Sequence, residues 1–293
     1  MTTIESLCAH VIFNEPMSKH THFNIGGPAD VMAFPETTDE LINVWNFCKT
    51  QNMPITVLGD GKNVLVADEG ICGVVVFTNK MNAIEILGEH IRAQSGTRLS
   101  TLADTVCNAN LAGLAFASGI PGTVGGAIYM NAGAYKYEIK DFCVSVTLFS
   151  NNEIIVKTNA EMNFGYRQSL AQSAEMLILD ATFKLYPGDS AQIREQMNDL
   201  NARRRKTQPL EFGSAGSFFK RPAGDFAGKL IEDSGLKGFR INDAQVSDKH
   251  AGFVVNRGNA SAKDVIALMH HVQETVFVKY GVKLEPEVRI LGF

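Results

Sequence analysis

The sequence predicts an α+β fold made of two parts, and three observations point to it. Short β-branched apolar runs bounded by turn residues, such as Ile55–Leu58, Val74–Phe77 and Met176–Leu179, are typical of strands. Helical periodicity occurs in fewer segments. The stretch Tyr186–Ser190 (Tyr-Pro-Gly-Asp-Ser) forms a seam, because strands dominate before it and a long polar helix follows it. A chain of 293 residues suits one large domain or two ordinary ones.

Two helices are predicted before the seam. The first begins at Thr37-Thr38-Asp39-Glu40, a capping-box pattern, and places four residues on one face: Leu41, Val44, Trp45 and Cys48. The second carries four residues at helical spacing: Leu99, Leu102, Val106 and Ala109.

Two further helices and a last strand are predicted after the seam. One helix opens at Ser190 and ends near the basic run Arg203–Lys206, since cations suit a helix C-terminus. The last helix opens at Ser261 and ends before Gly281, a residue suited to the left-handed position beyond a helix. The run Leu284–Leu291 predicts a strand, which we expect to return to the first part.

Composition and charge exclude several classes of protein. The 27 basic and 31 acidic residues give a formal charge of −4, which argues against a nucleic-acid or polybasic membrane partner. No apolar run reaches the roughly 18–20 residues that span a bilayer, and Met1–His10 lacks the pattern of a signal peptide. Five scattered cysteines without CxxC spacing predict free thiols in a cytoplasmic protein, with neither disulfides nor a metal site.

The strongest local motif is the glycine-rich segment Ser118–Ala127. Four glycines within it remove side chains from the backbone, and exposed N–H groups there could cradle a pyrophosphate. Its spacing matches neither a Walker A loop nor a Rossmann fingerprint. The alternative is a tight structural turn.

A second glycine-rich turn lies at Gly59–Asn63, between two apolar runs. An ordinary hairpin is the alternative interpretation. Two phosphate-suited loops beside strands together favour a dinucleotide ligand.

Three further residues could carry chemistry. Arg167, beside Tyr166, could bind a carboxylate in a bidentate fork or simply stack on that ring. Ser217 could be a nucleophile or a proton donor, with His250 as its base, although its surroundings are not GxSxG. Glu287, at the last predicted strand, could serve in acid–base work or lie in solvent.

Taken together, the motifs resemble the UDP-N-acetylenolpyruvylglucosamine reductases of bacterial peptidoglycan synthesis, and the compact length resembles the shorter type of that family. The resemblance extends from about His20 to Gly292. The matching blocks are Phe23–Asp30, Gly59–Asn63, Ser118–Tyr135, Phe164–Ser169, Gln208–Leu210, Ser214–Pro222, Ala227–Ile231, Gln245–Asn256 and Leu284–Gly292.

The resemblance implies a particular domain organisation. Residues 1–187 would form a two-part FAD-binding module of the vanillyl-alcohol-oxidase type, divided near residue 80. Residues 188–282 would form a smaller α+β substrate-binding domain, and residues 283–293 a strand that returns to the FAD module. FAD would be bound without a covalent link.

The resemblance also implies a reaction. NADPH, the co-substrate, would reduce FAD, and the reduced flavin would convert UDP-N-acetylglucosamine enolpyruvate to UDP-N-acetylmuramate. Ser217 would donate a proton to C2, while Arg167 and Glu287 would stabilise the enolate and bind the substrate carboxylate. The cellular roles implied are peptidoglycan synthesis, cell wall biogenesis, cell shape and cell division, in a cytoplasmic and monomeric enzyme without membrane insertion.

Two sets of binding residues follow from the same resemblance. The cofactor would contact Gly59, Asp60, Gly61, Lys62, Asn63, Ser118, Gly119, Ile120, Pro121, Gly122, Thr123, Gly125, Gly126 and Ala127. The substrate would contact Tyr166, Arg205, Lys220, Lys229, Gln245 and His250.

The chain departs from the family pattern at four places. Lys62 replaces a common Ser, Asn24 a usual basic residue, Asn242-Asp243 a usual Gly-Gly, and Arg221 a frequent Asn. Two other functions remain open on the residues alone. One is a flavin oxidase of the same fold that uses O₂, and the other is a non-catalytic protein that binds flavin or a UDP-sugar.

Overall fold

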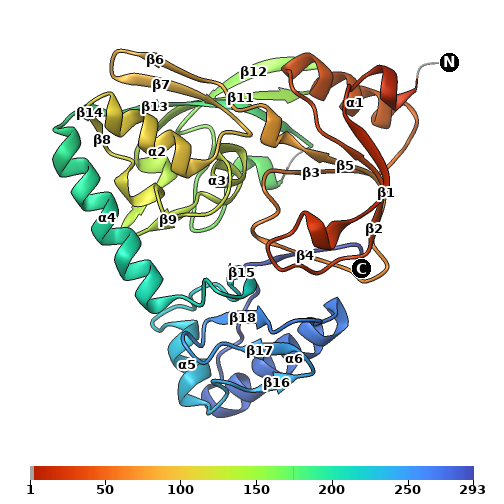
Figure 1. The fold of residues 1–293 in the computed structure, drawn as a ribbon, viewed down its shortest axis with the longest axis vertical. Coiled ribbons are helices and arrows are strands. Elements are labelled where there is room, and N and C mark those ends of the chain that lie inside the picture. The colour runs from red at the N-terminus through yellow and green to blue at the C-terminus, as the bar shows by residue number, and fades with distance from the viewer. Residues whose placement is uncertain (1–2, 174) are drawn as a thin grey trace. The chain divides into compact units, whose positions relative to one another are not determined.

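A computed structural model describes residues 3–173 and 175–293 (Figure 1). Contacts divide the chain into two compact units, each assembled from three segments. Unit 1 contains residues 1–12, 31–60 and 73–203, and unit 2 contains residues 13–30, 61–72 and 204–293. The change between the units at residue 203 lies inside helix α4 (Ser190–Thr207). The boundary at residue 187 that the family resemblance implies remains a prediction.

The largest sheet of unit 1 is antiparallel, with strand order β12-β11-β13-β7-β6. Helix α3 (Val124–Met130) packs against β13 and β7. Helix α2 (Leu99–Asn108) adds its buried face to the same core, through residues such as Leu102 and Val106. The strand bounds are Glu153–Thr158, Cys143–Ser150, Leu177–Lys184, His90–Gln94 and Ile84–Leu87, in the order given.

A second sheet has the order β1-β2-β5-β3, in which β5 and β3 run parallel. Helix α1 (Thr38–Thr50) buries Leu41, Val44 and Cys48 in the core that also contains Val74 and Val76 of β5. The bounds are Val11–Pro16 for β1, Pro28–Ala33 for β2, Ile71–Phe77 for β5 and Ile55–Leu58 for β3.

Unit 2 is built around a sheet of order β15-β18-β17-β16 with helix α6 packed on β17 and β16. Alternate residues of the strands, such as Ala244, Val246 and Val254, pack with α6 in one core. A separate parallel pair joins β4 to β19. The bounds are β15 Gly213–Ser217, β18 Phe253–Asn256, β17 Ala244–Val246, β16 Arg240–Ile241, α5 Ala227–Asp233, α6 Ala262–Tyr280, β4 Val64–Val66 and β19 Arg289–Leu291.

Two short strand pairs and several single 3-10 turns complete the described residues. The pairs are β8 (Leu111–Ala112) with β14 (Tyr186–Pro187) and β9 (Gly133–Ala134) with β10 (Tyr137–Glu138). The turns are η1 Ile4–Ser6, η2 Met17–Lys19, η3 Thr78–Lys80, η4 Ala115–Ala117, η5 Ile139–Asp141 and η6 Leu170–Gln172.

The structure confirms the four predicted helices, and the ends of two of them show why. Ser261 and Asp264 form a reciprocal capping box at the start of α6, and Gly281 ends it at φ 68°. At α1, Thr37 accepts a hydrogen bond from the Glu40 N–H, but the Glu40 carboxylate accepts from the Glu36 N–H instead of from Thr37. The capping-box prediction was therefore half right at α1.

Two strand predictions need correction. The run Leu284–Leu291 is regular only from Arg289, because a single bridge between Phe219 and Pro286 takes the place of a ladder before it. The hairpin interpretation of Gly59–Asn63 is wrong. Strand β3 pairs with β5 and strand β4 pairs with β19, so the two flanking strands do not pair with each other.

Positive backbone angles explain one departure from the family pattern. Asn242 has φ 49° in the turn between β16 and β17, where the family usually has glycine. Asparagine tolerates this conformation better than other side chains do. The Asn242 amide donates to Asp264, which ties the turn to the start of α6.

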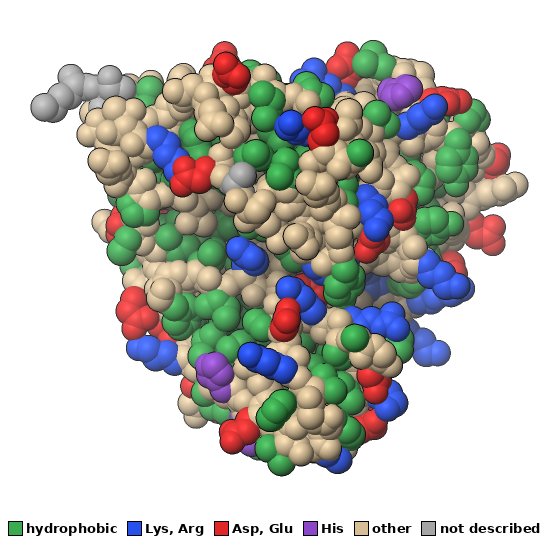
Figure 2. Space-filling view, turned by 180° about the vertical axis from the view of Figure 1, so that it is seen from behind, with side chains coloured by type: hydrophobic (Ala, Val, Ile, Leu, Met, Phe, Trp, Pro, Cys, Tyr) green, Lys and Arg blue, Asp and Glu red, His purple; other side chains and the backbone are tan. Residues whose placement is uncertain are grey.

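Acidic and basic side chains are interspersed over the face shown in Figure 2, in line with the small net charge. Within the described residues, no helix is long and apolar enough to cross a membrane. Among the described residues, no three metal-ligating side chains come together in a group that could hold a metal ion. The five cysteines are free thiols.

Candidate functional site

Several glycine-rich loops of unit 1 meet around Thr123. A Cβ atom on Gly59 would lie 2.2 Å from Thr123 Oγ1, so only glycine allows this approach. Thr123 is 1% exposed and caps α3 by accepting from the Gly126 N–H at 3.4 Å. The first glycine loop and the start of α3 are therefore held against each other.

The connection between β7 and α2 completes this arrangement. The Val124 N–H donates to Thr97 O at 2.8 Å, and the Gly125 N–H donates to Ser95 O at 2.7 Å. The Ala127 N–H donates to Thr123 O within the helix. These bonds use several of the backbone N–H groups that the glycine-rich sequence suggested as an anion-binding nest. Among the described residues, the N–H groups of Gly119 and Gly122 have no hydrogen-bond partner. These two donors of the segment therefore remain available to an anion.

Two buried polar atoms beside these loops have no hydrogen-bond partner among the described residues. They are Asn79 Oδ1 and Ser95 Oγ. A Cβ on Gly96 would lie 1.7 Å from Thr78 O, which shows how closely the two segments approach. Buried polar groups are normally paired, so this region has unmet hydrogen-bonding capacity that a polar cofactor could satisfy. These loops fit a ligand with phosphate and polar groups.

Asp60 is fixed at the end of the first loop. Its carboxylate is 7% exposed and accepts from Arg98 Nε at 3.1 Å. The pair ties the loop to the start of α2, since Arg98 is the N-cap residue of that helix. We infer that Asp60 positions the loop, because its carboxylate already has a cationic partner.

The residues after Asp60 belong to unit 2. Gly61 has φ 60°, and a Cβ there would lie 2.3 Å from His20 O. The His22 N–H donates to Gly61 O at 3.0 Å. Burial, with the Lys62 ammonium nearby as a smaller cause, lowers the pKa of His22. A cation at position 62 therefore lies near a neutral imidazole.

Arg167 occupies a strained backbone position in unit 1. Its φ is 56°, in the left-handed region that non-glycine residues seldom adopt. Its guanidinium donates to Asn131 O at 3.4 Å and to Gly133 O at 3.3 Å, and lies 5.0 Å from the Tyr166 ring. The side chain is therefore held in one direction by two carbonyl groups and an aromatic ring.

Asn131 supports the Arg167 turn through the hydrogen bonds of its side chain. It is fully buried, and its amide donates to Gly165 O at 2.9 Å and to Glu138 at 3.0 Å. Its Oδ1 accepts from the Lys140 N–H at 3.1 Å. Asn131 lies within the matching block Ser118–Tyr135, but no local pattern marks it as a supporting residue.

Ser217 and Glu287 are brought together in unit 2. Ser217 is exposed at the end of β15, after an irregularity at Gly216, which has φ 77°. The next residue, Phe218, accepts from the Glu287 N–H at 2.8 Å. Asn63 adds a bond from Nδ2 to Glu287 O at 3.1 Å. A backbone network thus joins Glu287 to the segment that directly follows Ser217.

The lysines proposed to bind substrate each have an acidic partner. Lys220 lies 3.3 Å from Glu285, and Lys229 lies 2.9 Å from Asp233 and 3.9 Å from Asp225. Hydrogen bonding to Asp233 raises the pKa of Lys229. A phosphate that binds Lys229 would compete with these carboxylates.

His250 lies beside β18 and α5. Burial lowers the pKa of His250, and its Nδ1 accepts from the Gly252 N–H at 3.1 Å. The neutral ring therefore carries its proton on Nε2 and can donate one hydrogen bond there. Arg205 is exposed, and its carbonyl accepts from Lys249 Nζ at 2.8 Å.

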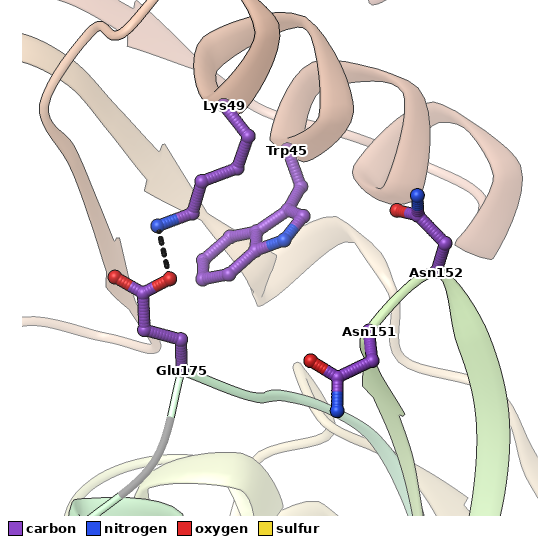
Figure 3. A pocket seen from close by; sticks show the side chains of 5 residues that line it. All are labelled: Trp45, Lys49, Asn151, Asn152 and Glu175. Carbon is purple, nitrogen blue, oxygen red and sulfur yellow. Dashed lines mark ion pairs between the residues drawn. The ribbon is translucent and has the colours of Figure 1, made fainter.

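An open cavity of about 260 Å³ lies elsewhere in unit 1, between α1 and the loop after β11. Figure 3 shows Lys49 directed toward Glu175, with a separation of 2.7 Å, beside Trp45. Lys49 Nζ also lies 4.7 Å from the centre of that ring. The opposite charges of Lys49 and Glu175 are paired with each other, and none of the predicted catalytic, cofactor-binding or substrate-binding residues lines this cavity. We therefore assign it no role.

Comparison with known proteins agrees with this geometry. The family model described as FAD binding domain matches residues 29–159, which include the glycine-rich loops around Thr123. The model described as UDP-N-acetylenolpyruvoylglucosamine reductase, C-terminal domain, matches residues 208–291, which include Ser217 and Glu287. The reductase of that name from Caldanaerobacter subterraneus subsp. tengcongensis is 49% identical over 280 residues, or 95% of this chain and 93% of the relative.

The chain belongs to the UDP-N-acetylenolpyruvoylglucosamine reductase family. A second relative, from Clostridium novyi, is 50% identical over 94% of this chain and 90% of its own length. The crystal structure of the reductase from Thermus caldophilus is 34% identical and has a TM-score of 0.82, covering 97% of this chain and 98% of that chain.

Membership confirms the predicted fold class, an α+β chain with an FAD-binding module and a second, smaller domain. It also confirms the predicted class of protein, an FAD-dependent oxidoreductase of the reductase family of peptidoglycan synthesis.

Proposed function

We propose that this family member reduces UDP-N-acetylglucosamine enolpyruvate to UDP-N-acetylmuramate with NADPH as the electron donor. The observation that carries the proposal is the backbone bond from the Glu287 N–H to the Phe218 carbonyl, which brings Glu287 next to the residue that follows Ser217. A non-catalytic flavin or UDP-sugar binder would need no such pairing.

The residues around Thr123 would hold the cofactor. Gly59, which allows the close approach, and the donors near Gly122 would face its phosphates, while Ser95 and Asn79 offer unpaired polar atoms. When bound, FAD supplies two-electron chemistry, taking a hydride from NADPH and passing it to the enolpyruvyl group.

Ser217 would donate the proton that completes the reduction. A serine hydroxyl is a weak acid in water, but an enolate is a strong base and can take its proton over a short distance. Ser217 is exposed at the end of β15, directly after an irregularity in the pairing of β15 with β18. These features suit a group that must meet a substrate.

Arg167 would bind the substrate carboxylate and stabilise the negative charge that develops next to it. A guanidinium offers two parallel donors to a carboxylate. Holding that charge in place before the reaction lowers the barrier electrostatically. The fixed direction of Arg167 in the structure supports this role.

Glu287 would stabilise the developing enolate. Its backbone is held on both sides, by Phe218 and Asn63. Tyr166, Arg205, Lys220, Lys229, Gln245 and His250 would contact the rest of the substrate. The same family resemblance supports a monomer in the cytoplasm.

The test is an anaerobic stopped-flow experiment on the purified protein with its flavin bound. NADPH is mixed first, and we expect the visible flavin absorbance to fall. UDP-N-acetylglucosamine enolpyruvate is mixed second, and we expect the absorbance to return without oxygen. If only air restores the absorbance, the protein is an oxidase and the proposed substrate is wrong.

A further inference from the structure

The Arg167 side chain belongs to a tight turn that is closed by two backbone hydrogen bonds. The Gly165 N–H donates to Gln168 O at 3.0 Å, and the Gln168 N–H donates to Gly165 O at 3.3 Å. Arg167 is the third of the four turn residues and has φ 56°. A left-handed third residue is typical of type II turns, which usually place glycine or asparagine there. The turn therefore needs support from other residues to keep an arginine in this conformation.

Gln172 joins this turn to the end of helix α3. Its Nε2 donates to Arg167 O at 3.0 Å and to Tyr129 O at 2.7 Å. Both partners are carbonyl oxygens, so the amide cannot be turned around without placing its own oxygen against an acceptor. The side chain is half-buried, and the Gln172 N–H donates to Ser169 O at 3.1 Å. We call the two bonds of Nε2 the Gln172 clamp, because they hold the carbonyl of Arg167 against α3.

The end of α3 suits this attachment. The last carbonyl groups of a helix have no partner within the helix and carry partial negative charge, so they attract amide and guanidinium donors. Tyr129 O also accepts from Ser169 Oγ at 2.9 Å, and Asn131 O accepts from the Arg167 guanidinium at 3.4 Å. The helix itself packs against β13 and β7. The turn can therefore move only if it loses bonds to a packed helix.

Gln172 and Asn131 hold different ends of the turn. The Asn131 amide donates to Gly165 O, at the first residue of the turn. The Gln172 clamp holds the carbonyl of Arg167 itself, the residue that carries the guanidinium. Without the clamp, the first end of the turn stays fixed, but Arg167 is freer to leave its disfavoured backbone conformation.

We propose that Gln172 is a positioning residue that keeps the Arg167 guanidinium in the direction that binds the substrate carboxylate. Gln172 acts through the Arg167 backbone and needs no contact with substrate or cofactor. It lies beyond the matching block Phe164–Ser169. This inference rests on the proposed function, because the assignment of Arg167 to the carboxylate belongs to that function.

The first test measures the turn and needs no substrate. Amide hydrogen exchange at Gly165 and Gln168 is followed by NMR in the FAD-loaded protein. In Gln172→Met, which keeps the side-chain length but donates no hydrogen bond, we expect both amides to exchange about 3- to 10-fold faster than in the wild type. Ser169→Ala is the matched control, because it removes a bond to the same α3 carbonyl and none within the turn. Exchange in the control should stay within about twofold of the wild type. Unchanged exchange in Gln172→Met, or equal acceleration in both variants, would overturn the clamp.

The second test measures the two half-steps of the reaction by anaerobic stopped flow. In Gln172→Met we expect flavin reduction by NADPH to stay within about twofold of the wild type, and reoxidation by UDP-N-acetylglucosamine enolpyruvate to slow about 10- to 100-fold. In an Arg167→Ala chain, Gln172→Met should slow reoxidation by less than about twofold more, because the group that Gln172 positions is gone. Ser169→Ala should reoxidise like the wild type. Equal slowing of both half-steps, or additive slowing in the double variant, would make Gln172 a general structural residue.

Flavin content and thermal unfolding identify a misfolded variant. If Gln172→Met does not fold, Gln172→Asn replaces it in both tests with the same expectations. Asparagine is one methylene shorter, so its amide cannot reach both carbonyl groups.

The outcomes separate this inference from the proposed function. Faster exchange of the turn in Gln172→Met, together with no turnover of the enolpyruvyl substrate by the wild type, overturns the proposed reaction and supports the clamp. Turnover by the wild type, together with unchanged exchange or unchanged reoxidation in Gln172→Met, overturns this inference alone.

Discussion

Asn131 allows a quantitative test of how the Arg167 turn is supported. Its fully buried side chain makes three hydrogen bonds, to Gly165, Glu138 and Lys140. At about 0.5–1.5 kcal/mol each, their loss in Asn131→Gly predicts a fall of about 1.5–4.5 kcal/mol in the free energy of unfolding. Asn131 has φ 42°, so Asn131→Ala should cost about 1–2 kcal/mol more through backbone strain.

Asn52 provides the matched control. It has φ 51° and is exposed at the end of α1. Asn52→Gly should leave stability within about 0.5 kcal/mol of wild type, and Asn52→Ala should lose about 1 kcal/mol from strain alone. The difference between the two positions isolates the contribution of the buried amide.

The assay is urea unfolding at saturating FAD, followed by the fluorescence of Trp45, the single tryptophan of the chain. Trp45 and Asn131 both belong to unit 1, so the signal reports the unit that the substitution affects. We also expect a higher KM for the enolpyruvyl substrate in Asn131→Gly. The lost Asn131 amide holds Gly165, which anchors the turn that carries Arg167. If Asn131→Gly is as stable as Asn52→Gly, the reasoning about the buried amide is wrong.

Three other predictions concern chemistry, cofactor and pH. Ser217→Ala should leave flavin reduction by NADPH nearly unchanged and slow reoxidation by the enolpyruvyl substrate about 10²–10⁴-fold; equal slowing of both steps in stopped flow would make the serine structural. Gly59→Ala should lose FAD on dialysis, and Thr123→Ala in the same chain should restore part of it by removing the atom 2.2 Å from the new Cβ; unchanged flavin absorbance in the single variant would refute this. Burial lowers the pKa of His22 and His250 in the folded protein below the ordinary histidine value of about 6.5. Below about pH 6.5 the unfolded chain therefore binds more protons than the folded protein does, and the melting temperature should fall as the pH drops from 7 toward 5. A flat profile over that range would contradict the assignment.

Local signals predicted the helices well because each helix end is decided by neighbouring residues. The reciprocal bonds of Ser261 and Asp264 and the left-handed Gly281 are encoded within a few positions of the boundary. The failed hairpin interpretation at Gly59–Asn63 shows the opposite case. Strand β4 pairs with a strand more than 200 positions later, and no local pattern contains that information.

Some residues of the candidate site could be predicted from the sequence, and others could not. Ser217, Arg167 and Glu287 were named through the family resemblance, and the structure adds the bond from the Glu287 N–H to the carbonyl of Phe218, the residue after Ser217. The supporting role of Asn131 could not be predicted, because it depends on burial and on partners brought by other segments. Asparagine at a left-handed position looks like any turn residue until its side chain is seen to be buried.

The pairing of β19 with β4 has a consequence for biosynthesis. Unit 1 is encoded entirely within the first 203 residues, so all its segments can leave the ribosome while the rest is still being made. In unit 2, residues 64–66 of β4 cannot pair until Arg289–Leu291 have been synthesised, more than 200 residues later. The last strand also positions Glu287 against Asn63. The nascent chain can therefore bring the glycine-rich loops around Thr123 together early, but the bond between Glu287 and Phe218 forms only after residue 287 has been added.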